Sequence, residues 1–260
     1  MSKFFQAKSF LAHWLDAVDD HSIHSPFFFD FYNRAIKGQV EEVPFAAIEN
    51  TRERLLANQS ILTVQDLGDT SPHFKNEQRT IAKIAQTSLN PPAQCQLYYR
   101  IASLLEAKKI IELGTSMGIC SLYLASVKDS RVITFEGNHD IANIAQTNFE
   151  YFNQGNIKLM EGNIDRTLPE FLQTPGKIDF VLMDANHRYE PTLRYFNWLT
   201  RRISDKGVVI IDDIYRSQQM AKAWRELRKH DLVYGSIDLF SCGILFFDLN
   251  LNKQHFTCQY

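Results

Sequence analysis

Five short apolar segments alternate with helical stretches in the second part of the chain, and this alternation limits the possible folds most strongly. The segments are rich in β-branched residues and apolar on both faces; they are Lys109–Leu113, Arg131–Phe135, Ile157–Glu161, Ile178–Met183 and Val208–Ile211. Strands of this kind are typical of a parallel sheet that is covered by helices on both faces. We therefore expect a doubly wound α/β domain over residues 91–260.

The last two apolar segments break this pattern. Leu232–Leu239 and Gly243–Leu249 follow each other with only Phe240–Cys242 between them. A connection that short joins antiparallel strands, because a parallel pair needs a long crossover. The sequence therefore predicts a mostly parallel sheet that ends in a C-terminal antiparallel hairpin.

Residues 1–90 differ from the rest, with helical patterns and many aromatic side chains, and the change falls near Asn90-Pro91-Pro92. We expect an N-terminal helical segment there. His21 and the motif His24-Ser25-Pro26 precede the aromatic residues Phe27–Phe29. Two interpretations of these residues stay open: they line an acceptor pocket, or they pack onto the sheet domain.

The overall composition weakens two classes of function. The net charge is −2 and the pI is near 6.4, so no basic field favours nucleic acid as a partner. Lys8, His13 and Asp16 interrupt the apolar core that a signal peptide would need, and no stretch reaches the length of a membrane span.

The cysteines are scattered, with no C-x-x-C pair and no zinc-site spacing; they are Cys95, Cys120, Cys242 and Cys258. The first three have apolar neighbours. We interpret them as buried thiols in a reducing compartment, which predicts a cytoplasmic protein.

Polar residues follow every one of the five predicted parallel strands. In an open α/β sheet, ligands bind beyond the carboxyl ends of the strands. The residues at these ends are Glu112, Gly114, Ser116 and Gly118, then Glu136, then Gly162 and Asn163, then Asp184, Asn186 and His187, and finally Asp212 and Asp213. This arrangement predicts a ligand site along the edge of the sheet.

The turn after the first strand narrows the choice of ligand. Gly114 and Gly118 allow a tight turn and close approach of a ligand to the backbone, and the turn leads into a helix N-terminus that favours anionic groups. Ser116 replaces the middle glycine of the dinucleotide motif G-x-G-x-x-G, so a diphosphate fits less easily than an amino-acid tail. Glu136 can bind both hydroxyls of a ribose, which NAD and S-adenosylmethionine share.

Several segments resemble class I S-adenosylmethionine-dependent methyltransferases. "IIELGTSMGICSLYLA" looks like their first motif, "VITFEGN" like the second, and "KLMEGNIDRTLP" like the segment that borders the adenine. "MDANHRYEPTLRYF" followed by "GVVIIDDI" looks most like the group with D-G-[DN]-H-x-Y-E, which is related to catechol-type O-methyltransferases. "HSIHSPFFFDFY" and the tail "IDLFSCGILFFDLNLNKQHF" resemble a smaller methyltransferase-like family from Bacteroidetes. The resemblance implies a Rossmann-like sheet with strand order 3-2-1-4-5-7-6.

The resemblance to catechol-type enzymes implies that the helical segment of residues 1–90 covers the substrate. It also implies a set of cofactor contacts. They are Glu112, Gly114, Ser116, Gly118, Glu136, Asn163 and Asp184. Asn163 departs from the aspartate that is common there, so the adenine amine keeps a hydrogen-bond partner but loses a charged one.

In catechol-type enzymes a magnesium ion holds the acceptor oxygen, and Asp184, Asp212 and Asp213 match the positions of its ligands. Asp212 and Asp213 are adjacent, however, and adjacent side chains in a strand point to opposite faces. Both bind a metal only if the strand has already ended. The alternative is that Asp184 faces the cofactor and Asp213 begins a loop.

His187 is the candidate general base, with Asp184 as the second catalytic candidate, because an imidazole can accept a hydroxyl proton near neutral pH. The alternative is a histidine that caps a helix or a strand end. Tyr189-Glu190-Pro191 is expected to begin the next helix.

The function expected from these residues is O-methylation of a small-molecule hydroxyl by S-adenosylmethionine, with Mg²⁺ or another divalent cation as a further hypothesis. Three alternatives stay open: a methyltransferase for nucleic acid or protein, an NAD-dependent oxidoreductase, and a methyltransferase-like scaffold without activity. The segment Asp184–His187 lacks the [DN]-P-P-[YF] pattern of many amino-methylating enzymes. A homodimer is one hypothesis for the assembly.

Overall fold

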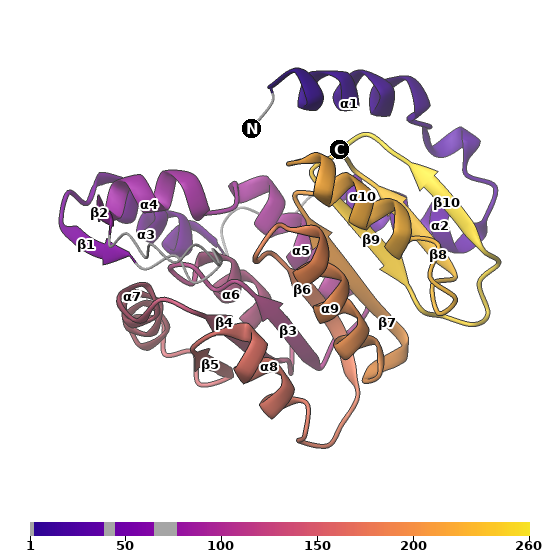
Figure 1. The fold of residues 1–260 in the computed structure, drawn as a ribbon. Helices are drawn as coiled ribbons and strands as arrows, with labels where there is room; N and C mark the ends of the chain where they lie inside the picture. The colour runs from indigo at the N-terminus through magenta and orange to yellow at the C-terminus, as the bar shows by residue number, and fades with distance from the viewer. Residues whose placement is uncertain (1–2, 39–44, 65–76) are drawn as a thin grey trace. The chain divides into compact units, whose positions relative to one another are not determined.

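The computed structural model describes residues 3–38, 45–64 and 77–260. The chain divides into two compact units: a central unit of residues 39–174, and a terminal unit that joins residues 1–38 to residues 175–260 (Figure 1). The N-terminal segment predicted over residues 1–90 therefore contributes to both units. A functional boundary near residue 90 stays a prediction.

The central unit contains three parallel strands in the order β3-β4-β5, with bounds Lys109–Leu113, Arg131–Glu136 and Ile157–Glu161. The register aligns Leu113 with Phe135 and Glu136 with Glu161, so the carboxyl ends of the three strands lie together. The helices of this unit are α3 (Ala46–Ala57), α4 (Ile81–Ser88), α5 (Pro92–Leu104), α6 (Ile119–Ala125), α7 (His139–Tyr151) and α8 (Ile164–Phe171).

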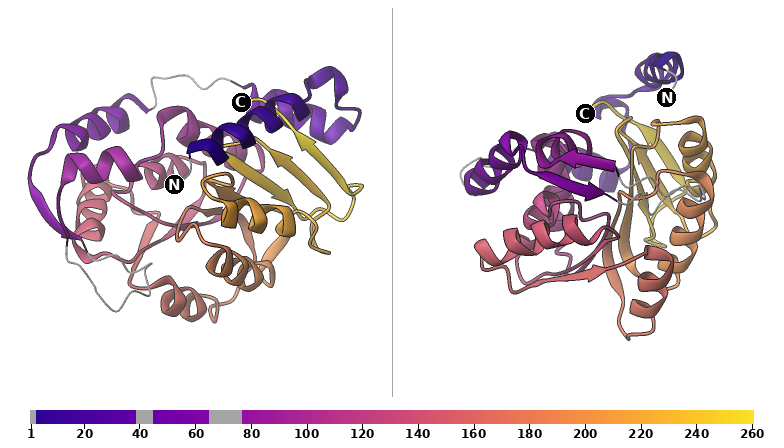
Figure 2. Two further views of the ribbon diagram at one scale, coloured as in Figure 1. Left: turned by 45° about the horizontal axis from the view of Figure 1, so that its top comes forward. Right: turned by 60° about the vertical axis from the view of Figure 1, so that its left-hand side comes forward.

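A two-stranded antiparallel ribbon accompanies the first helices of the central unit (Figure 2). Its strands are β1 (Ile61–Val64) and β2 (Glu77–Thr80). The sequence patterns predicted only helices there. The Thr80 side chain ends the ribbon and caps α4, because it accepts a hydrogen bond from the Lys83 N–H.

The terminal unit contains the strand order β6-β7-β9-β8-β10. The bounds are Ile178–Met183 for β6, Ile203–Asp212 for β7, Gly235–Asp238 for β8, Cys242–Phe246 for β9 and Gln254–Thr257 for β10. β6 and β7 are parallel, while β9 pairs antiparallel with both β7 and β8. The predicted C-terminal hairpin is therefore confirmed, and β10 is an additional parallel edge strand.

Helices cover both faces of the terminal sheet. The helices of this unit are α1 (Lys3–Asp16), the short η1 (Asp20–Ser22), α2 (Pro26–Phe31), η2 (Tyr32–Ile36), α9 (Tyr189–Thr200) and α10 (Gln218–Leu227), of which α2 and α10 cover opposite faces. Trp224 of α10 packs against Gly243, where a Cβ would overlap the indole ring. Phe28 of α2 packs against Phe246, which lies on the opposite face of β9. The terminal sheet is thus buried between two helical layers (Figure 2).

The predicted fold class is confirmed. The strand orders of the two units, β5-β4-β3 and β6-β7-β9-β8, correspond to the two parts of the expected order 3-2-1-4-5-7-6. Cys95, Cys120 and Cys242 are buried and free, as expected, and Cys258 is buried and free as well. Within the described ranges, every helix is too short or too polar to cross a lipid bilayer.

Candidate active site

The turn from β3 to α6 has the backbone geometry that its glycines predict. Gly114 has φ of 102° and Gly118 has φ of 83°, both in the left-handed region that favours glycine. A Cβ on Gly118 would lie 2.5 Å from Phe149 Cε1, so no larger side chain fits there. Ser116 also has a positive φ, of 48°, and its hydroxyl lies 2.7 Å from the Ser88 hydroxyl at the end of α4.

Glu136 lies at the end of β4, and its carboxylate contacts this turn. Its Oε2 atom accepts a hydrogen bond from the Ser116 N–H at 2.9 Å, and its Oε1 atom accepts one from the Asn138 N–H at 2.9 Å. Burial raises the pKa of Glu136 above its ordinary value, and these backbone donors act in the opposite direction. The structure thus places the predicted ribose-binding acid directly beside the predicted cofactor turn.

Glu112, another predicted cofactor contact, lies fully buried inside β3. Its Oε2 atom accepts hydrogen bonds from the Ser121 and Thr134 hydroxyls, whereas its Oε1 atom is buried without a hydrogen-bond partner among the described residues. Burial raises the pKa of Glu112 to about 7. Its direct contact with a cofactor stays a prediction.

Asn163, the predicted partner of the adenine, begins helix α8. Its Oδ1 atom accepts a hydrogen bond from the Asp165 N–H at 2.8 Å, which makes Asn163 the N-cap of that helix. The side chain is exposed. The capping contact explains the asparagine by itself, and the adenine contact stays a prediction.

In the terminal unit, His187 lies between two carboxylates. Its Nε2 atom is 3.4 Å from Asp184 Oδ1 and 3.9 Å from Asp213 Oδ2, while its Nδ1 atom is buried with no hydrogen-bond partner among the described residues. Burial lowers the pKa of His187, Asp213 acts to raise it, and Arg216 acts to lower it further. A neutral ring that carries its proton on Nε2, the nitrogen nearer the carboxylates, leaves the Nδ1 lone pair able to accept a proton.

The two adjacent acids after β7 occupy different environments. Asp212 is the last residue of the strand, pairs with Cys242 and is buried. Asp213 has φ of 55° and its side chain is 42% exposed, so the chain leaves the strand there. Arg216 Nη1 donates to Asp213 Oδ2 at 2.6 Å. This arginine was not among the predicted residues, although an acid and an arginine three residues apart after a strand are a visible signal.

The three candidate metal ligands do not form a metal site as they are placed. Among the described residues, no group of three His, Cys, Asp or Glu side chains is arranged to hold a metal ion. Arg216 already supplies the positive charge beside Asp213. We therefore assign no step to a cation, and the magnesium hypothesis for Asp184, Asp212 and Asp213 stays a prediction.

Two other predicted features have clear positions. Tyr189 begins α9, as expected, and Pro191 lies in its first turn. Phe28 is buried against Phe246 and Phe256, and Phe27 contacts Phe246 edge-on. These contacts correspond to the packing interpretation of the aromatic motif.

Comparisons with known proteins found similar sequences and similar folds. Residues 111–214 match the model of a family described as a methyltransferase domain. A catechol O-methyltransferase from Niastella koreensis is 28% identical over 129 residues, which cover 48% of this chain and 58% of that protein. One from Mycobacterium tuberculosis is 26% identical over 119 residues, or 45% of this chain and 52% of that protein. The chain thus spans only about half the length of these relatives.

The fold comparison extends further along the chain. An O-methyltransferase from Bacillus cereus, solved in complex with SAH, superposes with a TM-score of 0.57 at 16% identity. The superposition covers 84% of this chain and 95% of that one. A likeness at this identity shows a shared fold.

Strand order, glycine turn and strand-end acid together define a class I S-adenosylmethionine-dependent methyltransferase fold. Within that fold, residues 111–214 match the model of a methyltransferase domain, and about half of the chain is similar in sequence to two catechol O-methyltransferases.

Proposed function

We propose that this chain transfers the methyl group of S-adenosylmethionine to a hydroxyl of a small molecule, with His187 as the proton acceptor. The main support is the orientation of the His187 ring, in which Nε2 faces Asp184 and Asp213 while Nδ1 is buried and unpartnered among the described residues. An oriented imidazole of this kind is suited to accept the proton of an attacking hydroxyl.

The reaction is an in-line displacement. The acceptor oxygen forms a bond to the methyl carbon, the bond from that carbon to the sulfonium sulfur breaks, and the hydroxyl proton passes to His187 Nδ1. Because the sulfonium is already an activated donor, catalysis consists mainly of positioning and proton acceptance. No covalent intermediate with the protein is needed.

The central unit supports the choice of cofactor. The Gly114–Gly118 turn and the Glu136 carboxylate supply the two features that bind the amino-acid tail and the ribose in the proposed complex. The catechol O-methyltransferase relatives support a hydroxyl acceptor. The buried free thiols support a reducing, cytoplasmic location.

Calorimetric titration with S-adenosylmethionine tests cofactor binding. Glu136→Gln should weaken binding at least tenfold, because the charged acceptor for the ribose hydroxyls is lost. Glu170→Gln makes the same change at an exposed site of α8 and should leave the affinity unchanged. If the unmodified protein binds neither S-adenosylmethionine nor its demethylated product at millimolar concentration, the proposal is wrong.

Transfer of a labelled methyl group to a panel of phenols, catechols and aliphatic alcohols tests the chemistry. His187→Ala should lower kcat by roughly 100-fold or more while leaving cofactor affinity unchanged, since general-base catalysis contributes about that much. His139→Ala, at a histidine whose side chain is 68% exposed, is the matched control. An unchanged kcat in His187→Ala would remove the assigned base. Loss of activity in EDTA that Mg²⁺ restores would instead support the cation hypothesis.

A further inference from the structure

Helix α1 contacts the rest of the terminal unit through its polar side. His13 Nε2 lies 3.2 Å from the Asp238 carbonyl oxygen and 3.3 Å from Asp238 Oδ1, and its side chain is 5% exposed. Gln6 Nε2 donates to the Arg216 carbonyl oxygen at 3.4 Å. Gln6 and His13 are two helical turns apart and lie on the same side of α1. That polar side therefore faces the rest of the unit.

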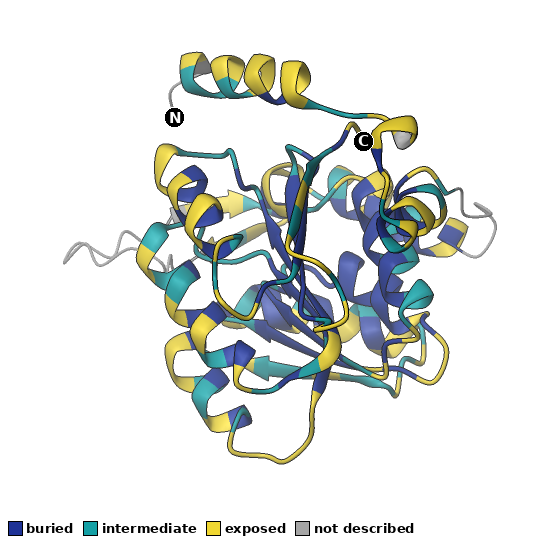
Figure 3. Ribbon diagram, turned by 90° about the vertical axis from the view of Figure 1, so that its right-hand side faces the viewer, coloured by how far each residue is buried: buried dark blue, intermediate teal, exposed yellow. Residues whose placement is uncertain are grey.

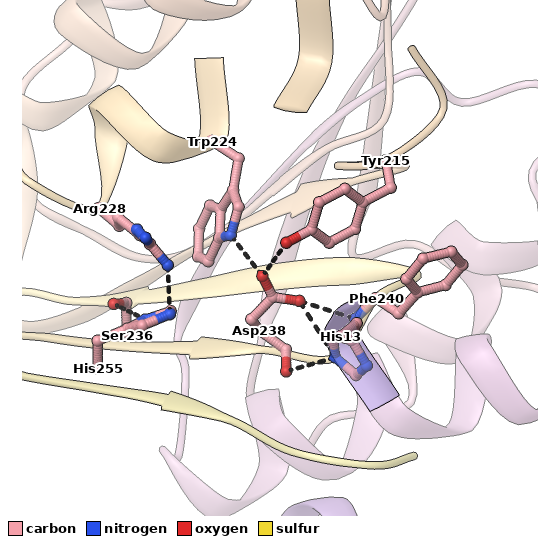
Figure 4. Close-up of polar contacts among 8 residues, drawn as sticks. All are labelled: His13, Tyr215, Trp224, Arg228, Ser236, Asp238, Phe240 and His255. Atoms are coloured by element: carbon pink, nitrogen blue, oxygen red, sulfur yellow. Dashed lines mark hydrogen bonds and ion pairs between the residues drawn. The ribbon is translucent and has the colours of Figure 1, made fainter. Parts of the chain in front are cut away.

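The His13 contact fixes the rotation of α1 about its own axis (Figure 4). The Asp238 carboxylate is buried, and its Oδ2 atom accepts hydrogen bonds from Tyr215 OH and Trp224 Nε1, both at 2.8 Å. Its Oδ1 atom accepts one from the Phe240 N–H at 3.0 Å. Because two of these donors come from the loop after β7 and from α10, and the third from the turn after β8, the carboxylate that holds His13 cannot turn.

The opposite side of α1 carries large apolar side chains that face solvent. Phe4 is 80% exposed, Leu11 57%, Trp14 54% and Leu15 68%. Their spacing puts them on one face of the helix, and Figure 3 shows exposed residues along its length. We call these four residues the outer α1 face. An ordinary surface helix turns its apolar side to the protein and its polar side to solvent. An exposed apolar face of this kind therefore marks an interaction surface.

We propose that the outer α1 face binds the same face of a second copy of this chain, with the two helices antiparallel. The charges along the helix are suited to this pairing. Exposed Lys8 lies in the first half, whereas exposed Asp16 and Asp19 lie at or just beyond the end. A two-fold axis across the helices brings the basic part of each toward the acidic end of the other, so the contact is self-complementary.

A lipid surface is a poorer partner for this helix. Helices that lie on membranes carry Lys and Arg on the polar side that faces the headgroups. The polar side of α1 instead carries His13 and Gln6, which are engaged within the unit, and the exposed charges at its end are acidic. Anionic headgroups would meet Asp16 and Asp19 with repulsion.

The size of the outer α1 face sets the expected strength. Its four side chains expose roughly 500 Å² per copy, given that an aromatic side chain buries about 150–250 Å². A standard interface buries about 800 Å² per partner, and about 1,000 Å² in total is the lower limit for a specific contact. The pair of α1 faces just reaches this limit. We therefore expect a dimer that dissociates on dilution.

Sedimentation velocity over a range of protein concentrations tests the proposal. The unmodified chain should shift from monomer to dimer as its concentration rises through the micromolar range. Leu11→Glu should weaken dimerisation at least tenfold. Leu249→Glu is the matched control, because Leu249 is similarly exposed, at 66%, but lies outside α1. A monomer at all concentrations, or a dimer that Leu11→Glu leaves intact, would overturn the proposal.

A charge exchange tests the antiparallel arrangement. Lys8→Glu and Asp16→Lys should each weaken the dimer, and the double variant should recover most of the lost affinity. If the double variant is as weak as the sum of the single changes, the arrangement is not antiparallel. Flotation with anionic phosphatidylglycerol vesicles tests the lipid alternative. If the chain is monomeric and binds the vesicles by α1, the partner of the outer α1 face is a membrane and the dimer proposal is wrong.

Discussion

The protonation of Glu112 should control how the stability of this protein varies with pH. The carboxyl is completely buried in β3, its Oε1 atom has no partner among the described residues, and its pKa is raised from 4.5 to about 7. A carboxyl whose pKa is raised in the folded state stabilises the fold below its unfolded pKa and loses that contribution as the pH rises through the folded pKa. A shift of this size corresponds to about 3 kcal/mol of unfolding free energy.

Replacement of Glu112 by Gln should remove this pH dependence. The Gln carbonyl can accept from Ser121 and Thr134 as the neutral carboxyl does, and it cannot ionise. Urea unfolding followed by circular dichroism between pH 4.5 and pH 8 measures the effect. We expect similar stabilities for both proteins at pH 4.5. At pH 8, Glu112→Gln should be more stable by about 3 kcal/mol.

The comparison between the two proteins cancels the titration of all other groups. Glu170→Gln, which changes an exposed carboxyl, controls for the loss of a negative charge and should follow the unmodified protein at every pH. Parallel stability curves for Glu112→Gln and the unmodified protein from pH 4.5 to pH 8 would refute the reasoning. They would mean that Glu112 ionises in the fold as readily as in the unfolded chain.

Substitutions at three further positions test local structure by the same urea unfolding. Gly118→Ala should cost about 2 kcal/mol or more, because its Cβ meets Phe149 at a residue with φ of 83°. Trp224→Phe should cost about 2 kcal/mol, because it removes a donor to the buried Asp238 carboxylate. Asn138→Ala should cost about 1 kcal/mol through loss of the α7 cap, and Asn138→Asp should retain most of it. Losses below about 0.5 kcal/mol in the first two would contradict the packing described.

The local sequence predicts the fold of this chain best where strands are buried on both faces. β3, β5 and β6 begin and end at the predicted residues, because apolar runs between glycines and charged residues have few alternatives. β10 and the β1–β2 ribbon were missed. β10 has an exposed or half-buried pattern and depends on pairing with β8, which is a contact between distant residues. Such pairing leaves no periodic signal.

In the candidate site, too, contacts between distant residues could not be predicted from the sequence. The positions of Glu136 and His187 follow from the rule that polar residues at strand ends face a ligand. Their partners do not follow from it. Nothing local in the sequence indicates that Glu112 is held by Ser121 and Thr134, or that the Ser116 N–H binds Glu136. These contacts depend on how β3, β4 and the turn between β3 and α6 meet in space.

The adjacent acids Asp212 and Asp213 show that the contacts of a side chain, and not its place in the sequence alone, determine its surroundings. As strand neighbours they would point to opposite faces, and the sequence alone could not decide whether the strand had ended. The structure ends β7 at Asp212 and turns the backbone at Asp213. Asp213 then meets both Arg216 and His187, whereas Asp212 stays buried at the strand end. Two residues of identical chemistry therefore have different surroundings, because Asp213 contacts the charged side chains of Arg216 and His187 while Asp212 is buried at the end of the strand.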